Sequence, residues 1–341
     1  MKTLVIRFSA LGDLVLCLPA LRDLAARGDR VQLLTLERYA SLAGPLPGLE
    51  RVWTLDPGEG LSGLRRLAEP LREERFDRVL DLHGNLRSRA LRLLLAGSGA
   101  RWAATGRDAL RRRLLVALPD ALRVRLRARP TTPVAERHRR ALEQLAGPGP
   151  QAPEALYPLA DELRRQVDGE LAALGLPAEA RPLALAPGAA WPEKVWPRFA
   201  ELVRLLPPEL HLLILGGPGE EAACRELGAQ AAGPAVVYAG DRPLPRVAAA
   251  LARGRALVSG DTGLAHLAEA VGRPTRVLFG PTVEAFGFAP RRADSMILQE
   301  DLPCRPCSLH GRRPCRLGDR RCLARLEPVR VLRSLEEGGL L

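Results

Sequence analysis

The turn Gly260-Asp261-Thr262-Gly263-Leu264-Ala265-His266 has the residue types of an anion-binding site. It follows an apolar run that predicts a strand, and it opens a segment whose apolar residues have helical spacing. The first N–H groups of a helix lack partners within the helix, and the helix dipole favours negative charge there. A phosphate could therefore bind at this turn, although Asp261 or Thr262 could instead cap the helix. Aspartic proteases also use Asp-Thr-Gly, but as a symmetric pair outside helices, whereas here the triplet occurs once.

Lys194 is a candidate ligand for an anion because lysine is rare in this chain. Of the 51 basic residues, only Lys2 and Lys194 are lysines. The loop before Lys194 contains Gly188, where a ligand can approach the backbone closely. The compact ammonium group of a lysine suits a diphosphate. The alternative is an ordinary surface lysine in a loop.

Two carboxylates follow predicted strands. Asp13 comes after the first strand and could be a general base that takes a proton from a hydroxyl, or it could cap the next helix. Glu220 ends the loop Gly216-Gly217-Pro218-Gly219-Glu220, where it could bind ribose hydroxyls or stand at a helix start. This loop is not the Gly-x-Gly-x-x-Gly dinucleotide fingerprint, and the chain has no Gly-Lys-Ser/Thr phosphate loop.

Four cysteines near the C-terminus are spaced like metal ligands. Cys304, Cys307, Cys315 and Cys322 are separated by two, seven and six residues. Four thiolates could bind a structural zinc ion or an iron–sulfur cluster. They could also form two disulfides, which a reducing cytosol disfavours. Cys17 and Cys224 are predicted to be core residues.

The candidate residues belong to two segments in which strands and helices alternate. Such alternation predicts parallel sheets with right-handed crossovers, and ligands bind these sheets at the carboxyl ends of the strands. The Gly- and Pro-rich stretch 147–153 predicts a linker. We therefore expect an N-terminal domain over 1–160, a C-terminal domain over 161–341 with a Cys-rich segment at 304–322, and a cleft between them. The predicted strands are 4–8, 31–36, 51–55, 78–82, 183–186, 212–215, 235–238, 256–259 and 276–279, and the predicted helices include 14–26, 61–74 and 161–174.

The chain is basic, and most of the excess charge lies in the first half. The net charge is +12, and residues 1–160 hold 27 basic and 17 acidic residues. This pattern indicates an anionic partner such as an acidic substrate, an anionic membrane or nucleic acid, unless it is only a high arginine background. With 4% aromatic residues and no recognition motif, nucleic-acid binding ranks last. No apolar run is long enough to span a bilayer, and the start does not resemble a signal peptide, so we expect a cytoplasmic protein.

Taken in order, several of these segments resemble glycosyltransferase family 9, the ADP-heptose:lipopolysaccharide heptosyltransferases. The resemblance covers nearly the whole chain, and the set of motifs is more specific than any one of them. The matching segments are 6–13 with Leu18-Pro19-Ala20, 77–84, Lys194-Val195-Trp196-Pro197, and 261–266 with Phe279-Gly280-Pro281-Thr282.

This resemblance implies a GT-B fold, in which two Rossmann-like doubly wound α/β domains face a central cleft and the last helix crosses back to the first domain. It implies an inverting transfer that needs no metal cofactor, with Asp13 as the base that activates the acceptor hydroxyl. Lys194, the backbone at Gly188 and the turn with Asp261, Thr262, Gly263 and His266 would hold the donor diphosphate, and Glu220 would lie at the nucleoside. Family members often carry Ser or Thr where this chain has Gly188-Ala189-Ala190, so backbone N–H groups would serve here.

The resemblance also implies partners. The donor would be a nucleotide sugar, ADP-heptose, and the acceptor an anionic glycolipid of the lipopolysaccharide core. Arg87, Arg107 and Arg111 are candidates for contacts with its acidic groups. Such an enzyme would be cytoplasmic, with peripheral contact at the inner membrane. The alternatives are a nucleotide-sugar epimerase of the same architecture and an anion- or nucleic-acid-binding protein.

Overall fold

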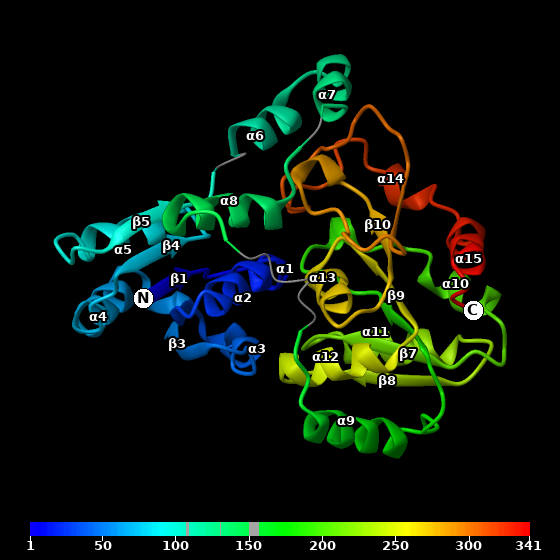
Figure 1. Cartoon of the computed structure of the whole chain (residues 1–341). Helices are drawn as coiled ribbons and strands as arrows, with labels where there is room; N and C mark the ends of the chain where they lie inside the picture. The colour runs from blue at the N-terminus through cyan, green and yellow to red at the C-terminus, as the bar shows by residue number, and fades with distance from the viewer. Residues whose placement is uncertain (107–108, 130, 150–156) are drawn as a thin grey trace. The chain divides into compact units, whose positions relative to one another are not determined.

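The computed structural model describes residues 1–106, 109–129, 131–149 and 157–341. The chain forms two compact units, each built on its own parallel sheet (Figure 1). The first unit comprises Met1–Arg107 and Thr132–Pro158, and the second comprises Asp108–Thr131 and Leu159–Leu341. Among the described residues, no helix is long and apolar enough to cross a bilayer.

The sheet of the first unit has the strand order β3-β2-β1-β4-β5, and all its pairs are parallel. Leu4 and Ile6 of β1 pack into a core with Leu64 and Leu67 on one face of the sheet. Runs of fully buried residues are expected in strands that helices cover on both faces. The strands are β1 (Lys2–Ile6), β2 (Arg30–Leu36), β3 (Leu49–Leu55), β4 (Arg78–Asp81) and β5 (Arg101–Ala104).

Helices cover both faces of this sheet. The helix predicted over 14–26 is two helices, α1 and α2, which meet at Leu16 and Cys17. Pro19 lies in the first turn of α2, where its missing N–H costs no helical hydrogen bond. The helices of the first unit are α1 (Leu11–Val15), α2 (Leu18–Ala26), α3 (Ala40–Ala43), α4 (Gly60–Glu73), α5 (Leu86–Leu94) and α8 (Val134–Ala146).

The sheet of the second unit has the order β11-β10-β9-β6-β7-β8, also with parallel pairs. The predicted strands are confirmed to within two residues at each end, whereas β5 and β11 were not predicted. Two parallel α/β sheets confirm the predicted fold class. The strands are β6 (Leu183–Ala186), β7 (Leu212–Gly216), β8 (Ala235–Ala239), β9 (Ala256–Gly260), β10 (Thr275–Phe279) and β11 (Met296–Gln299).

The C-terminal helix α15 (Pro328–Glu337) packs within the second unit. The Trp196 indole donates to the Leu326 carbonyl, 3.1 Å away, and the buried Arg276 guanidinium donates to the Ser334 carbonyl. The expectation that the last helix returns to the first domain is therefore wrong. The other helices of this part are α9 (Asp161–Ala173), α10 (Phe199–Leu205), α11 (Glu221–Ala229), α12 (Leu244–Arg253), α13 (Gly263–Ala270) and α14 (Arg321–Ala324).

A helical hairpin joins the second unit from within the first half of the sequence. It consists of α6 (Ala109–Ala117) and α7 (Asp120–Arg127), which follow β5 of the first unit along the chain. Leu115 is fully buried against Val283 and Phe286. The sequence-based division at residue 160 did not anticipate this exchange, and it places the second unit's start two residues later than the structure does.

Candidate active-site residues

Asp13 lies just beyond the carboxyl end of β1, in the first turn of α1. Nη2 of Arg7 is 2.5 Å from its Oδ1, and the Ala10 amide donates to its Oδ2 at 3.3 Å. Arg7 also donates to the carbonyl of Leu82, which follows β4. By accepting from the Ala10 amide, Asp13 also caps the start of α1, which is the alternative role that the sequence left open. The Asp13 side chain nevertheless stays 20% exposed, enough for a hydroxyl to reach it.

The surroundings of Asp13 keep it ionised. Burial works toward a higher pKa, but the Arg7 charge and the Ala10 hydrogen bond together hold the pKa of Asp13 below its ordinary value. His138 on α8 is buried nearby, with its Nδ1 3.1 Å from the Leu16 carbonyl. Burial and the Arg7 charge lower the pKa of His138 to about 4, so this imidazole is neutral at pH 7. Asp13 is thus the ionised member of the group.

The loop after β4 adds polar groups at the same end of the sheet. The Asp81 carboxylate accepts from the amides of His83 and Gly84 at 2.9 and 2.8 Å, which fixes the turn. Burial and then the Arg7 charge lower the pKa of His83 to about 4. Asn85 caps α5 by accepting from the Ser88 amide. Neither Arg7 nor the two histidines was singled out from the sequence.

In the second unit, Lys194 and Asp261 form a partly buried ion pair. Nζ of Lys194 lies 2.6 Å from Oδ2 of Asp261 and 2.7 Å from the backbone oxygen of the same residue. The Thr282 hydroxyl donates to Oδ2 of Asp261 at 2.7 Å. Burial works toward a higher pKa, but Lys194 and Thr282 hold the pKa of Asp261 below its ordinary value. The loops after β6, β9 and β10 therefore meet in one charged cluster.

Helix α13 begins beside this cluster. Thr262 stands at its N-cap without a side-chain capping bond, and Gly263 is the first helical residue. The Thr262 hydroxyl oxygen has no hydrogen-bond partner among the described residues. His266 is buried one turn into the helix and acts electrostatically on Asp261. Hence the turn provides free helix N–H groups and a hydroxyl beside the Lys194 ammonium.

Gly188 and Glu220 meet at the ends of the adjacent strands β6 and β7. A Cβ atom at Gly188 would lie 2.0 Å from Oε1 of Glu220, so any larger residue would displace this carboxylate. The Gly217 amide donates to Oε2 of Glu220 at 2.7 Å. The glycine therefore lets the carboxylate lie against the loop that leads to Lys194.

The Cys-rich segment packs on the same loops. A Cβ atom at Gly311 would lie 2.7 Å from Cγ of Lys194, so the segment contacts the stem of that side chain. Arg305 is 1% exposed and donates to the carbonyls of Gly280 and Thr282 at 2.5 and 2.8 Å. Arg320 donates to the carbonyl of Pro192. The segment thereby supports the position of both Lys194 and Thr282.

All four clustered cysteines are free thiols in this structure, as are Cys17 and Cys224, which are buried as predicted. Burial, with a smaller contribution from the neighbouring thiols Cys304, Cys307 and Cys315, raises the pKa of Cys322 to about 12. The four sulfurs are therefore close enough to interact electrostatically. Within the described ranges, however, no three His, Cys, Asp or Glu side chains are arranged to hold a metal ion.

The three arginines predicted to meet an acidic acceptor lie in different places. Arg87 is in the first turn of α5, close enough to His83 for its charge to lower the pKa of that imidazole. Arg111 belongs to the hairpin of the second unit and donates to the carbonyls of Leu126 and Arg129. Arg107 lies outside the described residues. Only Arg87 is thus placed at the strand ends that carry Asp13.

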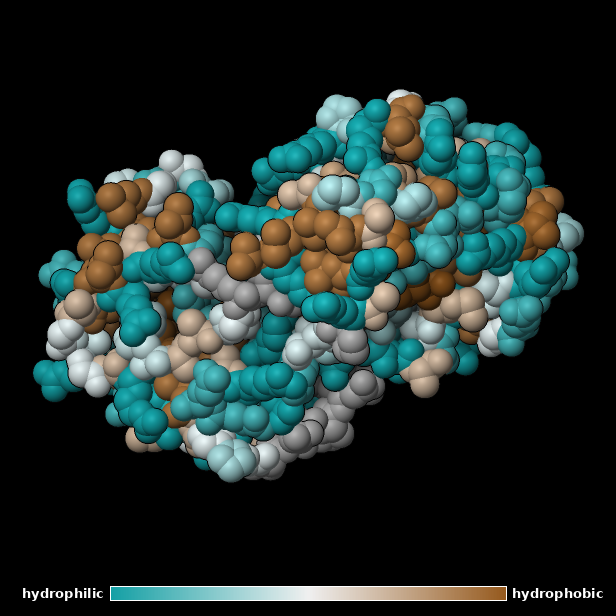
Figure 2. Space-filling view, turned by 90° about the horizontal axis from the view of Figure 1, so that it is seen from above, coloured by the Kyte–Doolittle hydropathy of each residue, from teal (hydrophilic) through white to brown (hydrophobic). Residues whose placement is uncertain are grey.

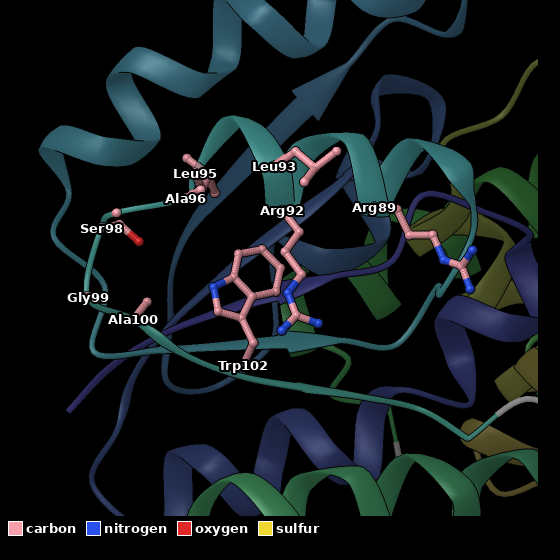
Figure 3. Close-up of a pocket in the computed structure, with 10 residues that line it drawn as sticks. Arg89, Arg92, Leu93, Leu95, Ala96, Ser98, Gly99, Ala100 and Trp102 are labelled. Atoms are coloured by element: carbon pink, nitrogen blue, oxygen red, sulfur yellow. The ribbon is translucent and has the colours of Figure 1, made fainter.

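A cavity of about 510 Å³ lies between α5, the following loop and β5 (Figure 3). Its lining includes Arg92 and Trp102, whose guanidinium carbon and ring centroid are 5.5 Å apart. In Figure 3 the two side chains lie beside each other, while Arg89 points away from them. None of the residues predicted for the site lines this cavity.

The comparisons with known proteins agree with one another. A family model described as glycosyltransferase family 9 (heptosyltransferase) matches residues 64–316. Lipopolysaccharide heptosyltransferase 1 of Pseudomonas aeruginosa is 31% identical, over 98% of this chain and 97% of that protein. A solved glycosyl transferase family 9 structure from Veillonella parvula has a TM-score of 0.79 at 22% identity and covers 99% of this chain and 96% of that one. E. coli heptosyltransferase WaaC with ADP has a TM-score of 0.68 at 22% identity, over 99% of this chain and 100% of that one.

These likenesses confirm the GT-B fold that the sequence resemblance implied. They give no support to an epimerase or to a nucleic-acid-binding protein.

Proposed function

Because the chain belongs to glycosyltransferase family 9, we propose that this glycosyltransferase moves a heptose from ADP-heptose to the lipopolysaccharide core or a related acidic glycan. The observation that carries the proposal is the ionised Asp13, held by Arg7 at the carboxyl end of β1. A relative named as a heptosyltransferase supports the sugar, and the ADP named in a solved structure of similar fold supports the nucleotide.

Asp13 acts as the general base in this proposal. Its carboxylate accepts the proton of the acceptor hydroxyl while the hydroxyl oxygen attacks the anomeric carbon. The bond between that carbon and the diphosphate oxygen breaks on the opposite side, so the configuration inverts. In this proposal Lys194 and the N-terminus of α13 neutralise the charge that develops on the departing diphosphate, so the step uses no metal cofactor. General-base catalysis of this kind contributes roughly 10²- to 10⁴-fold to rate.

The diphosphate binds at the start of α13 in this proposal. Lys194 has three N–H donors, of which Asp261 accepts two, and the third is available to a phosphate oxygen. The N–H groups of Thr262 and Gly263 and the Thr262 hydroxyl complete the anion site. Asp261 is negative and repels phosphate, so its role is to orient Lys194.

Glu220 and Gly188 are proposed to lie at the nucleoside end of the donor. The Glu220 carboxylate keeps acceptor capacity beyond its bond from the Gly217 amide, so it can accept from ribose hydroxyls. Gly188 leaves the room in which that carboxylate lies.

Arg87 is the proposed contact for an acidic group of the acceptor, because it lies at the same strand ends as Asp13. Arg111 is already used within the hairpin, where it holds the end of α7. An acceptor of this class is lipid-linked, so we further propose a cytoplasmic enzyme with peripheral contact at the inner membrane.

A structural metal at Cys304, Cys307, Cys315 and Cys322 is a separate proposal. It is supported by the clustering of four thiols in one segment, and it requires side-chain rotation, since no three of them are arranged around one point. Elemental analysis of anaerobically purified protein tests it. About one equivalent of zinc, or of iron with matching sulfide, supports the site, and less than about half an equivalent contradicts it.

The proposed reaction is tested with purified protein, ADP-heptose and a delipidated core acceptor. Transfer of one heptose with inversion, detected by mass spectrometry and NMR, supports the proposal. Donor isomerised in the absence of acceptor would support an epimerase instead. A glycan product formed only from another nucleotide sugar would correct the donor while leaving the reaction class intact.

A further inference from the structure

The α6–α7 hairpin exposes aliphatic side chains on its outer face. Leu110 is 71% exposed and Leu122 is 48% exposed, and Leu114 and Val124 are exposed as well. On α6, the exposed residues at 110, 113, 114 and 117 are three and four positions apart, so they form one stripe along the helix. Figure 2, which views the molecule from the side of the hairpin, shows hydrophobic side chains gathered there between hydrophilic ones.

The inner face of the hairpin is firmly anchored. The Arg112 guanidinium lies 5.0 Å from the centre of the Phe286 ring. Arg123 is 2% exposed and donates to the carbonyls of Leu115 and Leu118. The outer leucines are therefore exposed although the hairpin that carries them is well packed. An exposed apolar stripe on such an element marks an interaction surface.

The charged residues of the hairpin are nearly all positive. Residues 109–129 contain seven arginines and a single acid, Asp120. Arg123 and Arg316 both contact the Asp120 carboxylate, at 2.8 and 2.7 Å, so its charge is compensated. Arg113 and Arg125 are exposed beside the outer leucines.

We propose that the outer face of the α6–α7 hairpin docks on an anionic phospholipid surface. Aliphatic residues next to arginines match the boundary between acyl chains and anionic headgroups, where helices lie in the membrane plane. A second copy of this chain would bring the same positive charge to this face, so self-association there is disfavoured. The inference rests on the proposed function, in which the acceptor is held at a membrane.

Vesicle sedimentation of the full chain, without donor or acceptor, tests the proposal. Vesicles with about one third phosphatidylglycerol should bind the protein. Binding should fall steeply as the salt concentration rises, and it should be much weaker to vesicles of pure phosphatidylcholine. The double variant Leu110→Ser/Leu122→Ser should lower the partition coefficient about tenfold, because two leucines no longer enter the interface. Arg113→Glu/Arg125→Glu should lower it by at least about tenfold through charge.

Matched controls separate this face from other exposed leucines. Leu174→Ser/Leu205→Ser changes two leucines that are 46% and 45% exposed elsewhere on the second unit and should leave binding unchanged. Leu86→Ser/Leu93→Ser tests the exposed leucines of α5 in the first unit. Unchanged ADP affinity and melting temperature show that each variant is folded.

Equal vesicle binding by the wild type and Leu110→Ser/Leu122→Ser would overturn the proposal, as would loss of binding in the α5 variant alone. A second outcome would show that another copy of the chain covers this face. In that case the wild type would not bind vesicles but would form a concentration-dependent dimer, and Leu110→Ser/Leu122→Ser would abolish the dimer. Since the vesicles carry no acceptor, these outcomes are independent of the transfer assay, which alone decides the proposed reaction.

Discussion

Nζ of Lys194 lies 2.6 Å from Oδ2 of Asp261, although 67 positions separate the two residues in the sequence. The pair joins the loop after β6 to the loop after β9, and these strands are neighbours in the sheet. The carboxylate sets the direction of the ammonium group and leaves it one free donor. The local charge is therefore nearly balanced before a diphosphate binds, and the helix N-terminus supplies the remaining attraction.

Replacing Lys194 by Ala should weaken ADP binding roughly 10- to 100-fold, the range for hydrogen bonds to charged groups. Isothermal titration calorimetry measures this change. Lys2→Ala is the matched control, since Lys2 is the only other lysine and pairs with Glu74 in the first unit. Equal ADP affinity of Lys194→Ala and Lys2→Ala would remove Lys194 from the donor site.

Two buried threonines allow a test of the hydroxyl that supports this pair. Thr282→Val removes the donor to Asp261 and should weaken ADP binding several-fold, because the carboxylate loses a partner that fixes it. Thr275→Val removes a fully buried hydroxyl that has no partner among the described residues. It should leave ADP affinity unchanged and stabilise the protein by about 1 kcal/mol.

Calorimetry and thermal melting distinguish the two threonines. A rise of about 2–4 °C is expected for Thr275→Val. A similar loss of ADP affinity in both variants would show that the effect is general packing rather than the Thr282–Asp261 hydrogen bond.

The sequence predicted most strands because buried parallel strands are continuous apolar runs. It missed β5 and β11, which lie at the sheet edges and are short and only partly buried. It also missed the hairpin, because the residues that bury Leu115 and that lie under the Arg112 guanidinium, such as Phe286, come from the distant C-terminal half. Tertiary contacts of this kind leave no local periodicity.

The same limit applies to the site. Asp13, Lys194 and Asp261 could be selected because each follows a strand, where parallel sheets bind ligands. Their partners could not: Arg7 looks like any charged residue at a strand end, and the role of Thr282 depends on a hydrogen bond across two loops. Residue type and spacing thus indicated the loops, while the pairing within them required coordinates.

Asp13→Asn should abolish transfer while donor binding survives. The amide keeps the size of the side chain but cannot accept a proton, so kcat should fall roughly 10²- to 10⁴-fold. Asp56→Asn is a suitable control, because Asp56 is an exposed acid of the first unit whose capping bond to the Gly58 amide an asparagine can also make. Near-normal turnover by Asp13→Asn, with ADP affinity intact in both variants, would assign the base to another residue.

The pH profile of transfer should report the Arg7–Asp13 pair. The charge of Arg7 helps hold the pKa of Asp13 below its ordinary value, so the base remains ionised in mildly acidic solution and activity is lost only as pH falls through that low pKa. Arg7→Gln removes the charge and should raise the pKa of Asp13, which moves the acid limb of kcat/KM to higher pH. Arg7→Lys keeps the charge and should keep the limb close to that of the wild type.

The comparison of these two variants separates charge from structure, because both lose the guanidinium that contacts Asp13 and the Leu82 carbonyl at the same time. Stability should follow the same sign. The contribution of a carboxylate with a depressed pKa is present above its unfolded pKa and declines as pH falls through the folded one. The pH at which the melting temperature begins to fall on acidification should therefore be higher for Arg7→Gln than for the wild type. An acid limb that is identical in Arg7→Gln and Arg7→Lys would show that Arg7 supports the loop and does not tune the base.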